Sequence, residues 1–137
     1  MNKQEQLAEI KLKRKNKVEA YDAAVKETRI DSEIKLGEIE ESTGKTLGIN
    51  LAVVFLPDGR FIAVKKAPAV VYNKISTATS NRNLTEELQS EFSAVAVEYP
   101  TAVEAEKMYL DFPNARDAVI NAASLLVAVD QSNLLGK

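Results

Sequence analysis

The sequence predicts a mostly helical α+β fold, with a long N-terminal helix, one β-hairpin and a C-terminal bundle of three or four helices. Residues 2–43 contain no proline and are rich in residues that favour helices. Residues 49–66 contain two runs of β-branched and aromatic residues around a Pro-Asp-Gly turn. The remaining apolar residues recur at helical spacing, interrupted by prolines. The 137 residues thus divide into a long amphipathic helix over 2–44 and a hairpin-plus-bundle domain over 49–130.

The long helix has recognisable ends and one narrow apolar stripe. Asn2 with Glu5 is a capping-box pattern, and Gly44 lies where a helix C-terminal cap belongs. The stripe consists of Leu7, Ile10, Val18, Tyr21 and Val25. An apolar stripe of this kind usually packs against another element or another subunit. We therefore expect these five side chains to bind a protein partner.

The hairpin is predicted from its turn. Pro57 presets the backbone of a type I turn, Asp58 suits the next position, and Gly59 accepts the left-handed conformation that follows. One face of the hairpin would hold Val53, Phe55, Phe61 and Ala63, and the other Val54, Ile62 and Val64. Helices should cover at least one of these apolar faces, because a lone hairpin is not stable in water.

Three basic residues accompany the hairpin, namely Arg60, Lys65 and Lys66. They are predicted to form a basic end that makes a secondary contact with the partner. An alternative explanation is that basic residues beside strands prevent edge-to-edge aggregation.

Helices should follow the hairpin as far as residue 129. Pro68 suits the first turn of one helix, and Asn83 with Glu86 is a capping-box pattern for the next. The second helix has an apolar stripe of Leu84, Leu88, Phe92, Val95 and Tyr99. Pro100 should end that helix, and Thr101 with Glu104 should cap a short one. The last predicted helix covers residues 114–129, with Val119, Ile120, Ala123 and Leu126 turned inward.

The composition excludes several kinds of chemistry. The chain has no cysteine, so disulfides, thiolate metal sites and cysteine nucleophiles are all absent. It has no histidine, the residue most used as a general base near neutral pH. The net charge of −2 disfavours a general nucleic-acid binder. The basic run “KLKRKNK” at residues 11–17 is explained by a solvated helix face, with an acidic partner or nucleic acid as the alternative.

Two patterns that could indicate catalysis have simpler explanations. “STGKT” at residues 42–46 resembles the end of a phosphate-binding loop, but Ile39 stands where that loop needs a glycine, so a helix C-cap is favoured. Carboxylates are frequent, but they lie on polar helix faces or in first turns. These are Glu38, Glu40, Glu41, Glu86, Glu87, Glu98, Glu104 and Glu106. We therefore predict no catalytic, metal-binding or cofactor-binding residue and no cofactor.

The sequence also predicts a cytoplasmic protein without a membrane partner. The first twenty residues are charged throughout, where a signal peptide would need an apolar segment. The most apolar stretch, residues 118–129, is too short to span a bilayer core of roughly 30 Å.

The order of residues between 53 and 127 carries a family resemblance. A strand pair ending in “FIAVKKAP” leads to a helix with “VYNKIS”, and then to “ELQSEFSAVAVEYPTAVEAEKMYLDFPNARDAVINAASLL”. This order resembles the small tail assembly chaperones of long-tailed bacteriophages. The matching residues are Lys66, Pro68, Tyr72, Tyr99, Pro100, Pro113 and the apolar run after Asn114. The resemblance implies a non-enzymatic protein that binds the tape-measure protein and keeps aggregation-prone helices soluble in the bacterial host cytoplasm until assembly.

The prediction is therefore a phage-type tail assembly chaperone or accessory protein that acts by protein–protein contact. Its partner would be the tape-measure protein or another tail or virion component, or a second copy of the chain in a homo-oligomer. The alternatives are a virion structural protein, such as a capsid or tail adaptor, and an inhibitor that binds a host factor. An enzyme is the least favoured class.

Overall fold

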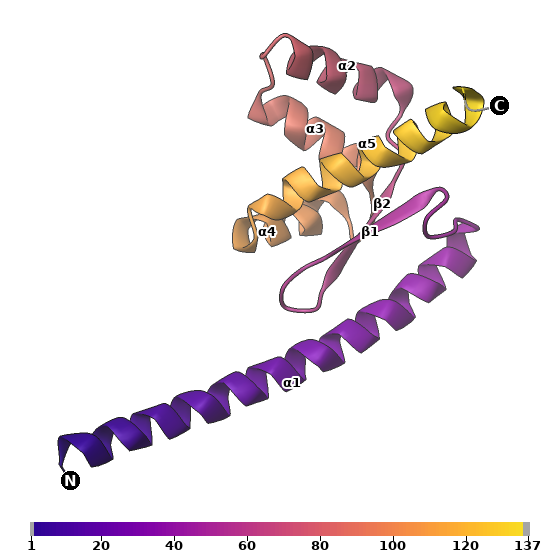
Figure 1. Ribbon diagram of the computed structural model, residues 1–137. Helices are drawn as coiled ribbons and strands as arrows, with labels where there is room; N and C mark the ends of the chain where they lie inside the picture. The colour runs from indigo at the N-terminus through magenta and orange to yellow at the C-terminus, as the bar shows by residue number, and fades with distance from the viewer. Residues whose placement is uncertain (1, 136–137) are drawn as a thin grey trace.

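The computed structural model of the protein describes the backbone of residues 2–135 and the side chains of residues 2–126 (Figure 1). It confirms the predicted α+β fold, with three strands in one antiparallel sheet of order β1-β2-β3. Along the chain the elements are α1 (Lys3–Thr43), β1 (Leu51–Phe55), β2 (Phe61–Lys65), α2 (Ala69–Ser80), α3 (Glu86–Ala96), β3 (Val97–Tyr99), α4 (Ala102–Asp111) and α5 (Asn114–Leu135).

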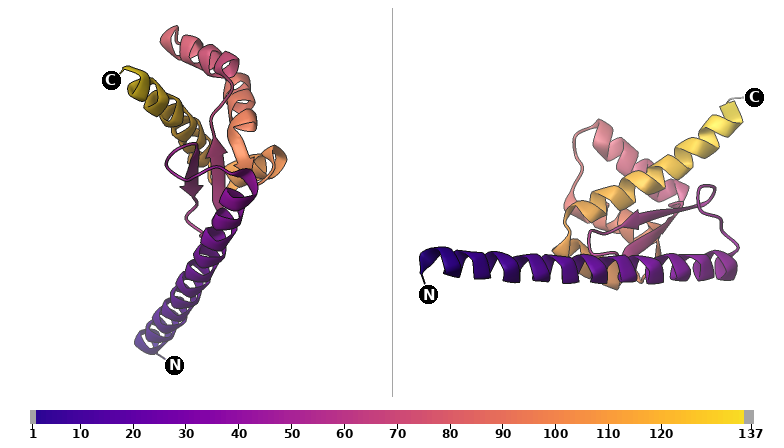
Figure 2. Two further views of the ribbon diagram at one scale, coloured as in Figure 1. Left: turned by 90° about the vertical axis from the view of Figure 1, so that its right-hand side faces the viewer. Right: turned by 60° about the horizontal axis from the view of Figure 1, so that its bottom comes forward.

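The sheet lies between two helical layers. In Figures 1 and 2, α1 crosses one face of the sheet and the C-terminal helices cover the other. Towards α1, the buried cluster consists of Leu36, Ile39, Leu51, Phe61 and Ala63, with Val53, Phe55 and Tyr99 packed against it. Towards the other helices, the cluster includes Ile62, Val64, Phe92, Val119 and Ala123, with Val54 at its margin. The predicted division of the hairpin into two faces is therefore confirmed, and both faces are covered.

The ends of α1 match their predicted caps. The Asn2 side chain accepts a hydrogen bond from the Glu5 N–H at 2.8 Å, which satisfies one of the donors that a helix start leaves without a partner. At the other end Gly44 has φ of 71°, the left-handed conformation that ends many helices.

The prediction that the helix before Pro100 includes Tyr99 is wrong. The helix α3 ends at Ala96, and residues 97–99 form β3, in which Ala63 of β2 pairs with Tyr99 and Val64 pairs with Val97. A residue that precedes proline is disfavoured in the helical conformation, and β2 offers an open edge to pair with. Tyr99 stacks on Phe61, with ring centres 5.1 Å apart, and so extends the cluster beneath α1.

Two helix ends in the C-terminal layer also differ from the prediction. The N-cap of α3 is Thr85, whose hydroxyl accepts from the Leu88 N–H at 3.2 Å, and not Asn83, whose N–H donates to Ala78 at the end of α2. The predicted Thr101 cap is confirmed by a 3.2 Å bond from the Glu104 N–H. The last helix begins at Asn114 as predicted and extends to Leu135, six residues beyond 129.

Among the helices of the described chain, none combines the length and apolar character needed to cross a membrane.

Candidate protein-binding surface

The helix α1 has a packed part and a projecting part. From Val25 onward it lies along the sheet, where Ser32, Leu36 and Ile39 are buried. Every residue from 2 to 24 is exposed. At 1.5 Å per residue the exposed part of the helix is about 33 Å long. Figures 1 and 2 show it extending past the hairpin into open space.

The hairpin turn fixes the place where α1 leaves the domain. Gly59 has φ of 94°, and a Cβ atom at this position would lie 2.6 Å from the Val25 carbonyl oxygen and 3.0 Å from the Arg29 nitrogen. The buried Ser32 hydroxyl donates a hydrogen bond to the Gly59 carbonyl at 2.7 Å. The turn is thus in direct backbone contact with α1, which only a glycine permits here.

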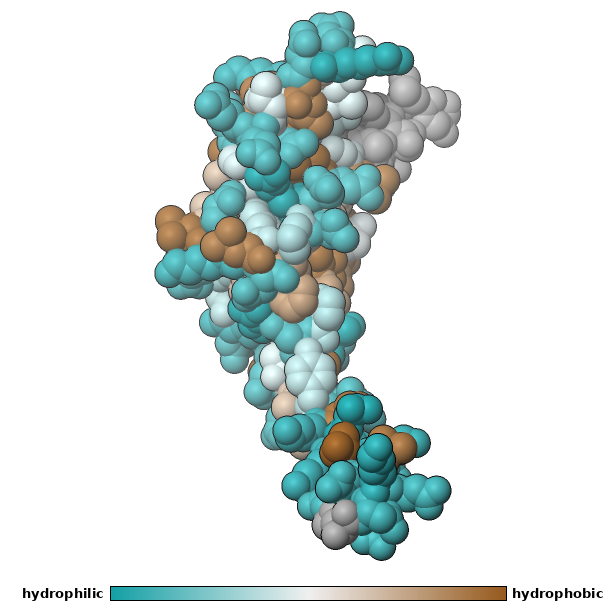
Figure 3. Space-filling model, turned by 90° about the vertical axis from the view of Figure 1, so that its left-hand side faces the viewer, coloured by the Kyte–Doolittle hydropathy of each residue, from teal (hydrophilic) through white to brown (hydrophobic). Residues whose placement is uncertain are grey.

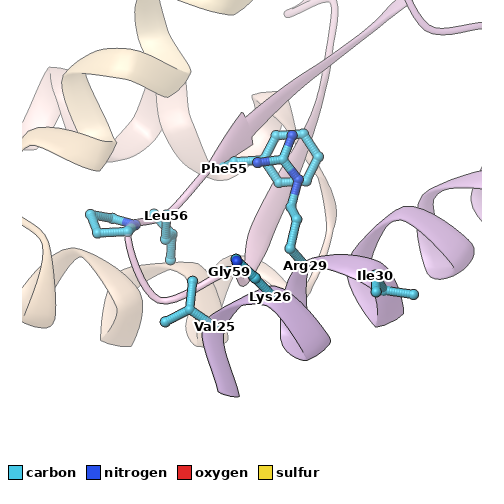
Figure 4. A pocket seen from close by; sticks show the side chains of 8 residues that line it. Val25, Lys26, Arg29, Ile30, Phe55, Leu56 and Gly59 are labelled. Atoms are coloured by element: carbon cyan, nitrogen blue, oxygen red, sulfur yellow. The ribbon is translucent and has the colours of Figure 1, made fainter. Parts of the chain in front are cut away.

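A pocket opens beside this contact (Figure 4). Its walls are Val25, Lys26, Arg29 and Ile30 of α1, and Phe55, Leu56, Pro57 and Gly59 of the hairpin. The Arg29 guanidinium carbon lies 3.3 Å from the centre of the Phe55 ring, a cation–π contact that joins α1 to β1. Val25, the last residue of the predicted stripe, is therefore half-buried and lies at the boundary of the two parts of α1.

The other four residues of the predicted stripe lie on the projecting part. Leu7 is 50% exposed, Tyr21 is 56% exposed, and the values for Ile10 and Val18 lie between them. Because successive residues of an α-helix turn by 100°, these four lie on the same side of the helix as Ser32, Leu36 and Ile39. The side of α1 that covers the sheet thus continues along the projecting part, where Arg14 interrupts the apolar side chains between Leu7 and Tyr21.

The packed part of this stripe was not recognised in the sequence. The apolar spacing is interrupted after Val25, because the next positions on the same side of the helix are Thr28 and Ser32. These short side chains occur where the hairpin turn approaches most closely, since the Thr28 Cβ lies 3.1 Å from the position that a Cβ on Gly59 would take. A contact between two distant segments therefore concealed the continuity of the stripe.

The predicted basic residues of the hairpin do not form one end. Arg60 lies at the turn, where its Nε is 2.7 Å from Asp58 and its Nη2 is 3.4 Å from Asp111. Lys65 lies at the opposite end of β2, about 16 Å away at strand spacing. Its Nζ is 3.7 Å from Glu98, which Lys45 also contacts. Lys66 is half-buried and is also engaged within the protein.

These three basic residues contact other groups of the domain, whereas the stripe residues on the projecting part are exposed to solvent. Carboxylates within the domain already offset the charges of Arg60 and Lys65, which weakens any pull on a partner. Their proposed role as a secondary contact remains a prediction, now for two separate places on the surface.

The basic run at residues 11–17 lies on the projecting part of α1. Two of its lysines form ion pairs along the helix, Lys13 with Glu9 at 3.2 Å and Lys15 with Glu19 at 3.9 Å. Pairs at this spacing add a little to helix stability, roughly 0.3–0.5 kcal/mol each. Figure 3 shows small apolar patches surrounded by hydrophilic atoms at this end of the molecule. At 100° per residue, Lys11 and Lys17 border the stripe on its two sides, while Glu9 and Glu19 offset the charges of Lys13 and Lys15.

Among the buried side-chain nitrogen and oxygen atoms of the described chain, only the Tyr109 hydroxyl has no hydrogen bond of good geometry. Burial raises the pKa of this phenol above its usual value, and the nearby Ser93 side chain offsets part of that rise. Around it, Arg116 of α5 donates to Gln89 and Ser90 of α3 at 3.0 and 3.3 Å. These polar side chains tie α3 to α5 and do not form a nucleophile with a base. Within the same described residues, no group of acidic side chains is arranged to hold a metal ion.

Comparisons of the chain with protein-family models, curated proteins and solved structures gave no match. The resemblance to the tail assembly chaperones therefore remains a prediction.

Proposed function

We propose that the protein is a non-enzymatic binding protein whose contact element is the projecting part of α1. One observation carries this proposal. The side of α1 that packs on the sheet continues over Leu7, Ile10, Val18 and Tyr21, where none of the described residues covers it. Exposed apolar side chains in continuity with a packed face are typical of a surface that is covered in a complex.

The charges beside the stripe indicate the chemistry of the partner. A helix that offers apolar side chains at spacings of three and four residues is complementary to a second amphipathic helix or to an apolar groove. The basic run at residues 11–17 flanks the stripe, so a partner with acidic residues at the margin of its apolar face would gain electrostatic attraction. Two copies of this segment would instead repel each other through that run. The proposed partner is therefore a different protein with an acidic amphipathic helix.

A more specific proposal follows from the family resemblance of residues 53–127. We infer that the protein is a phage-type tail assembly chaperone or accessory protein in the bacterial host cytoplasm, with the tape-measure protein as its partner. The absence of cysteine and histidine supports a non-enzymatic role. The projecting apolar stripe supports binding to helices that would otherwise aggregate.

Affinity purification of the chain from phage-infected or native cells, with identification of co-purifying proteins, tests this proposal. The informative variants are Val18→Asp and Tyr21→Asp, because both residues are exposed and lie on the stripe. We expect either variant to reduce binding of the partner at least about tenfold, which corresponds to 1.4 kcal/mol. The matched control is Val103→Asp, which replaces a residue that is 68% exposed and belongs to α4, outside the stripe.

The same experiment separates the alternatives. Partner binding that is equal for the wild type and all three variants would contradict a role of the stripe. A tail component as the partner, with the chain missing from purified particles by mass spectrometry, supports the assembly chaperone. The chain within finished particles would instead indicate a virion structural protein, and a single stoichiometric host protein would indicate an inhibitor.

A further inference from the structure

The strand β1 forms an open edge of the sheet. It pairs with β2 on one side, and Val54 stands opposite Ile62 in that register. The Leu56 N–H donates to the Arg60 carbonyl at 2.8 Å, which fixes Leu56, Val54 and Ala52 as the residues bonded to β2. The N–H and C=O groups of Val53 and Phe55 therefore point away from β2. Within the described chain, no hydrogen bond from outside the sheet reaches them.

The sequence of β1 contains none of the residues that usually prevent an edge strand from pairing with another chain. Sheet edges usually carry lysine, proline or a bulge, which prevents pairing with another chain. The strand reads Leu-Ala-Val-Val-Phe and contains neither a charge nor a proline. Exposed apolar side chains also flank it. Leu47 and Leu125, the latter 57% exposed, line one pocket with Leu51, Ala52 and Val53.

We propose that β1 pairs with β1 of a second copy of the chain, antiparallel and about a two-fold axis at Val54, so that two sheets join into one of six strands. In this register Val53 of each copy exchanges both backbone hydrogen bonds with Phe55 of the other. All outward groups of these two residues are then satisfied. This surface is distinct from the projecting part of α1, so the inference goes beyond the proposed function.

The neighbouring registers leave groups without partners. A shift that pairs Val53 with Val53 places Phe55 opposite Leu51, whose carbonyl already accepts from the Gly48 N–H at 2.9 Å. A shift in the other direction places Val53 opposite Pro57, which has no N–H to donate. The register centred on Val54 is the one that avoids both losses.

Self-pairing also explains the apolar surroundings of the edge. Because the two-fold axis is perpendicular to the joined sheet, both copies have α5 on the same face. The two Leu125 side chains then lie on the same face of the joined sheet, next to the junction of the two β1 strands. Burial of these exposed leucines in the dimer would stabilise the interface. The strand β1 carries no charge that would attract an oppositely charged strand or repel a second copy of itself, so an identical strand is a suitable partner.

A cysteine cross-link tests the register directly, because the chain has no cysteine of its own. In the proposed dimer the two Val54 residues form a non-hydrogen-bonded pair with Cα atoms about 4.5 Å apart, within the range of a disulfide. Val54→Cys should therefore give a covalent dimer under mild oxidation. The matched control is Ala52→Cys, on the same face of the same strand, because the two Ala52 residues would lie about 14 Å apart and could not bridge.

Sedimentation or light scattering of the intact chain measures the association itself. We expect a concentration-dependent dimer for the wild type. Val53→Pro removes an N–H that β2 does not use, and Leu125→Glu places a charge at the junction, so each should weaken the dimer at least about tenfold. Val103→Glu, at an exposed position elsewhere, should leave the dimer unchanged. Circular dichroism shows whether each variant is folded. If Val53→Pro does not fold, the result for Leu125→Glu decides whether the dimer uses this edge.

Three results would overturn the proposal. One is a wild type that stays monomeric at high micromolar concentration. Another is a dimer that folded Leu125→Glu leaves intact. The third is cross-linking that is as efficient for Ala52→Cys as for Val54→Cys.

Discussion

At the scale of single residues, Gly59 is where the hairpin and α1 meet most closely. Its positive φ and the 2.6 Å approach of a hypothetical Cβ to the Val25 carbonyl are separate obstacles to any side chain. A helix backbone cannot move aside as a flexible side chain can. The position of α1 on the sheet therefore depends on residue 59 having no Cβ atom.

The first prediction concerns this contact. Gly59→Ala should lower the free energy of unfolding by about 2–4 kcal/mol, because backbone strain and a steric clash act together. The matched control is Gly48→Ala, since Gly48 has φ of 90° and no atom within 4 Å of the added Cβ. The control should lose only about 1 kcal/mol from strain. Urea unfolding measures both, and equal losses would contradict the importance of the contact with α1.

A second prediction concerns the buried Tyr109 hydroxyl. Burial raises the pKa of this phenol, so the folded protein keeps it protonated at a pH where the unfolded chain ionises. Its contribution to stability is complete below the unfolded pKa of about 10 and is lost as the pH rises through the higher folded value. Tyr109→Phe should therefore unfold less readily than the wild type in alkali.

Urea unfolding at neutral pH and above pH 10 measures this difference. At neutral pH, Tyr109→Phe should be as stable as the wild type or slightly more stable, because it removes a buried hydroxyl that lacks a good hydrogen bond. Tyr21→Phe is the control, since Tyr21 is exposed on the projecting part of α1. A loss of stability at neutral pH would mean that the Tyr109 hydroxyl makes a useful hydrogen bond.

At the scale of elements, the two parts of α1 should contribute unequally to stability. Deletion of residues 2–22 removes only exposed side chains, so the free energy of unfolding should change by less than about 0.5 kcal/mol. Leu36→Ala in the packed part should cost about 2–5 kcal/mol, because Leu36 is buried against the sheet. Urea unfolding compares the two. A large loss on deletion would show that the projecting part stabilises the domain.

Local signals in the sequence predicted most of these elements. The caps at Asn2, Gly44 and Thr101 and the turn at residues 57–59 depend on neighbouring residues alone, so they could be recognised without the fold. The strand β3 could not, because Val97 and Tyr99 fit a helical spacing as well as a strand. Only the open edge of β2, more than thirty residues earlier in the chain, decides between them.

At the scale of the whole molecule, the candidate surface was predictable in part. The stripe from Leu7 to Val25 was found from its spacing, but the sequence did not show which part of α1 the domain itself covers. That depends on the approach of the hairpin turn to residues 25–32, which is a long-range contact. The open edge of β1 was equally hidden, since a hairpin pattern does not say which of its strands gains a third neighbour.

The continuity of α1 has a consequence for geometry. Because one helix runs from the sheet to its free end, the direction in which the stripe faces is set by the rotation of the helix where it is packed. One inserted residue near position 24 would turn the whole stripe by 100° away from its present direction, with hardly any loss of helix. Seven inserted residues would restore that direction to within about 20° and move the stripe outward by about 10 Å. The domain thus sets both the distance and the angle at which a partner would be held.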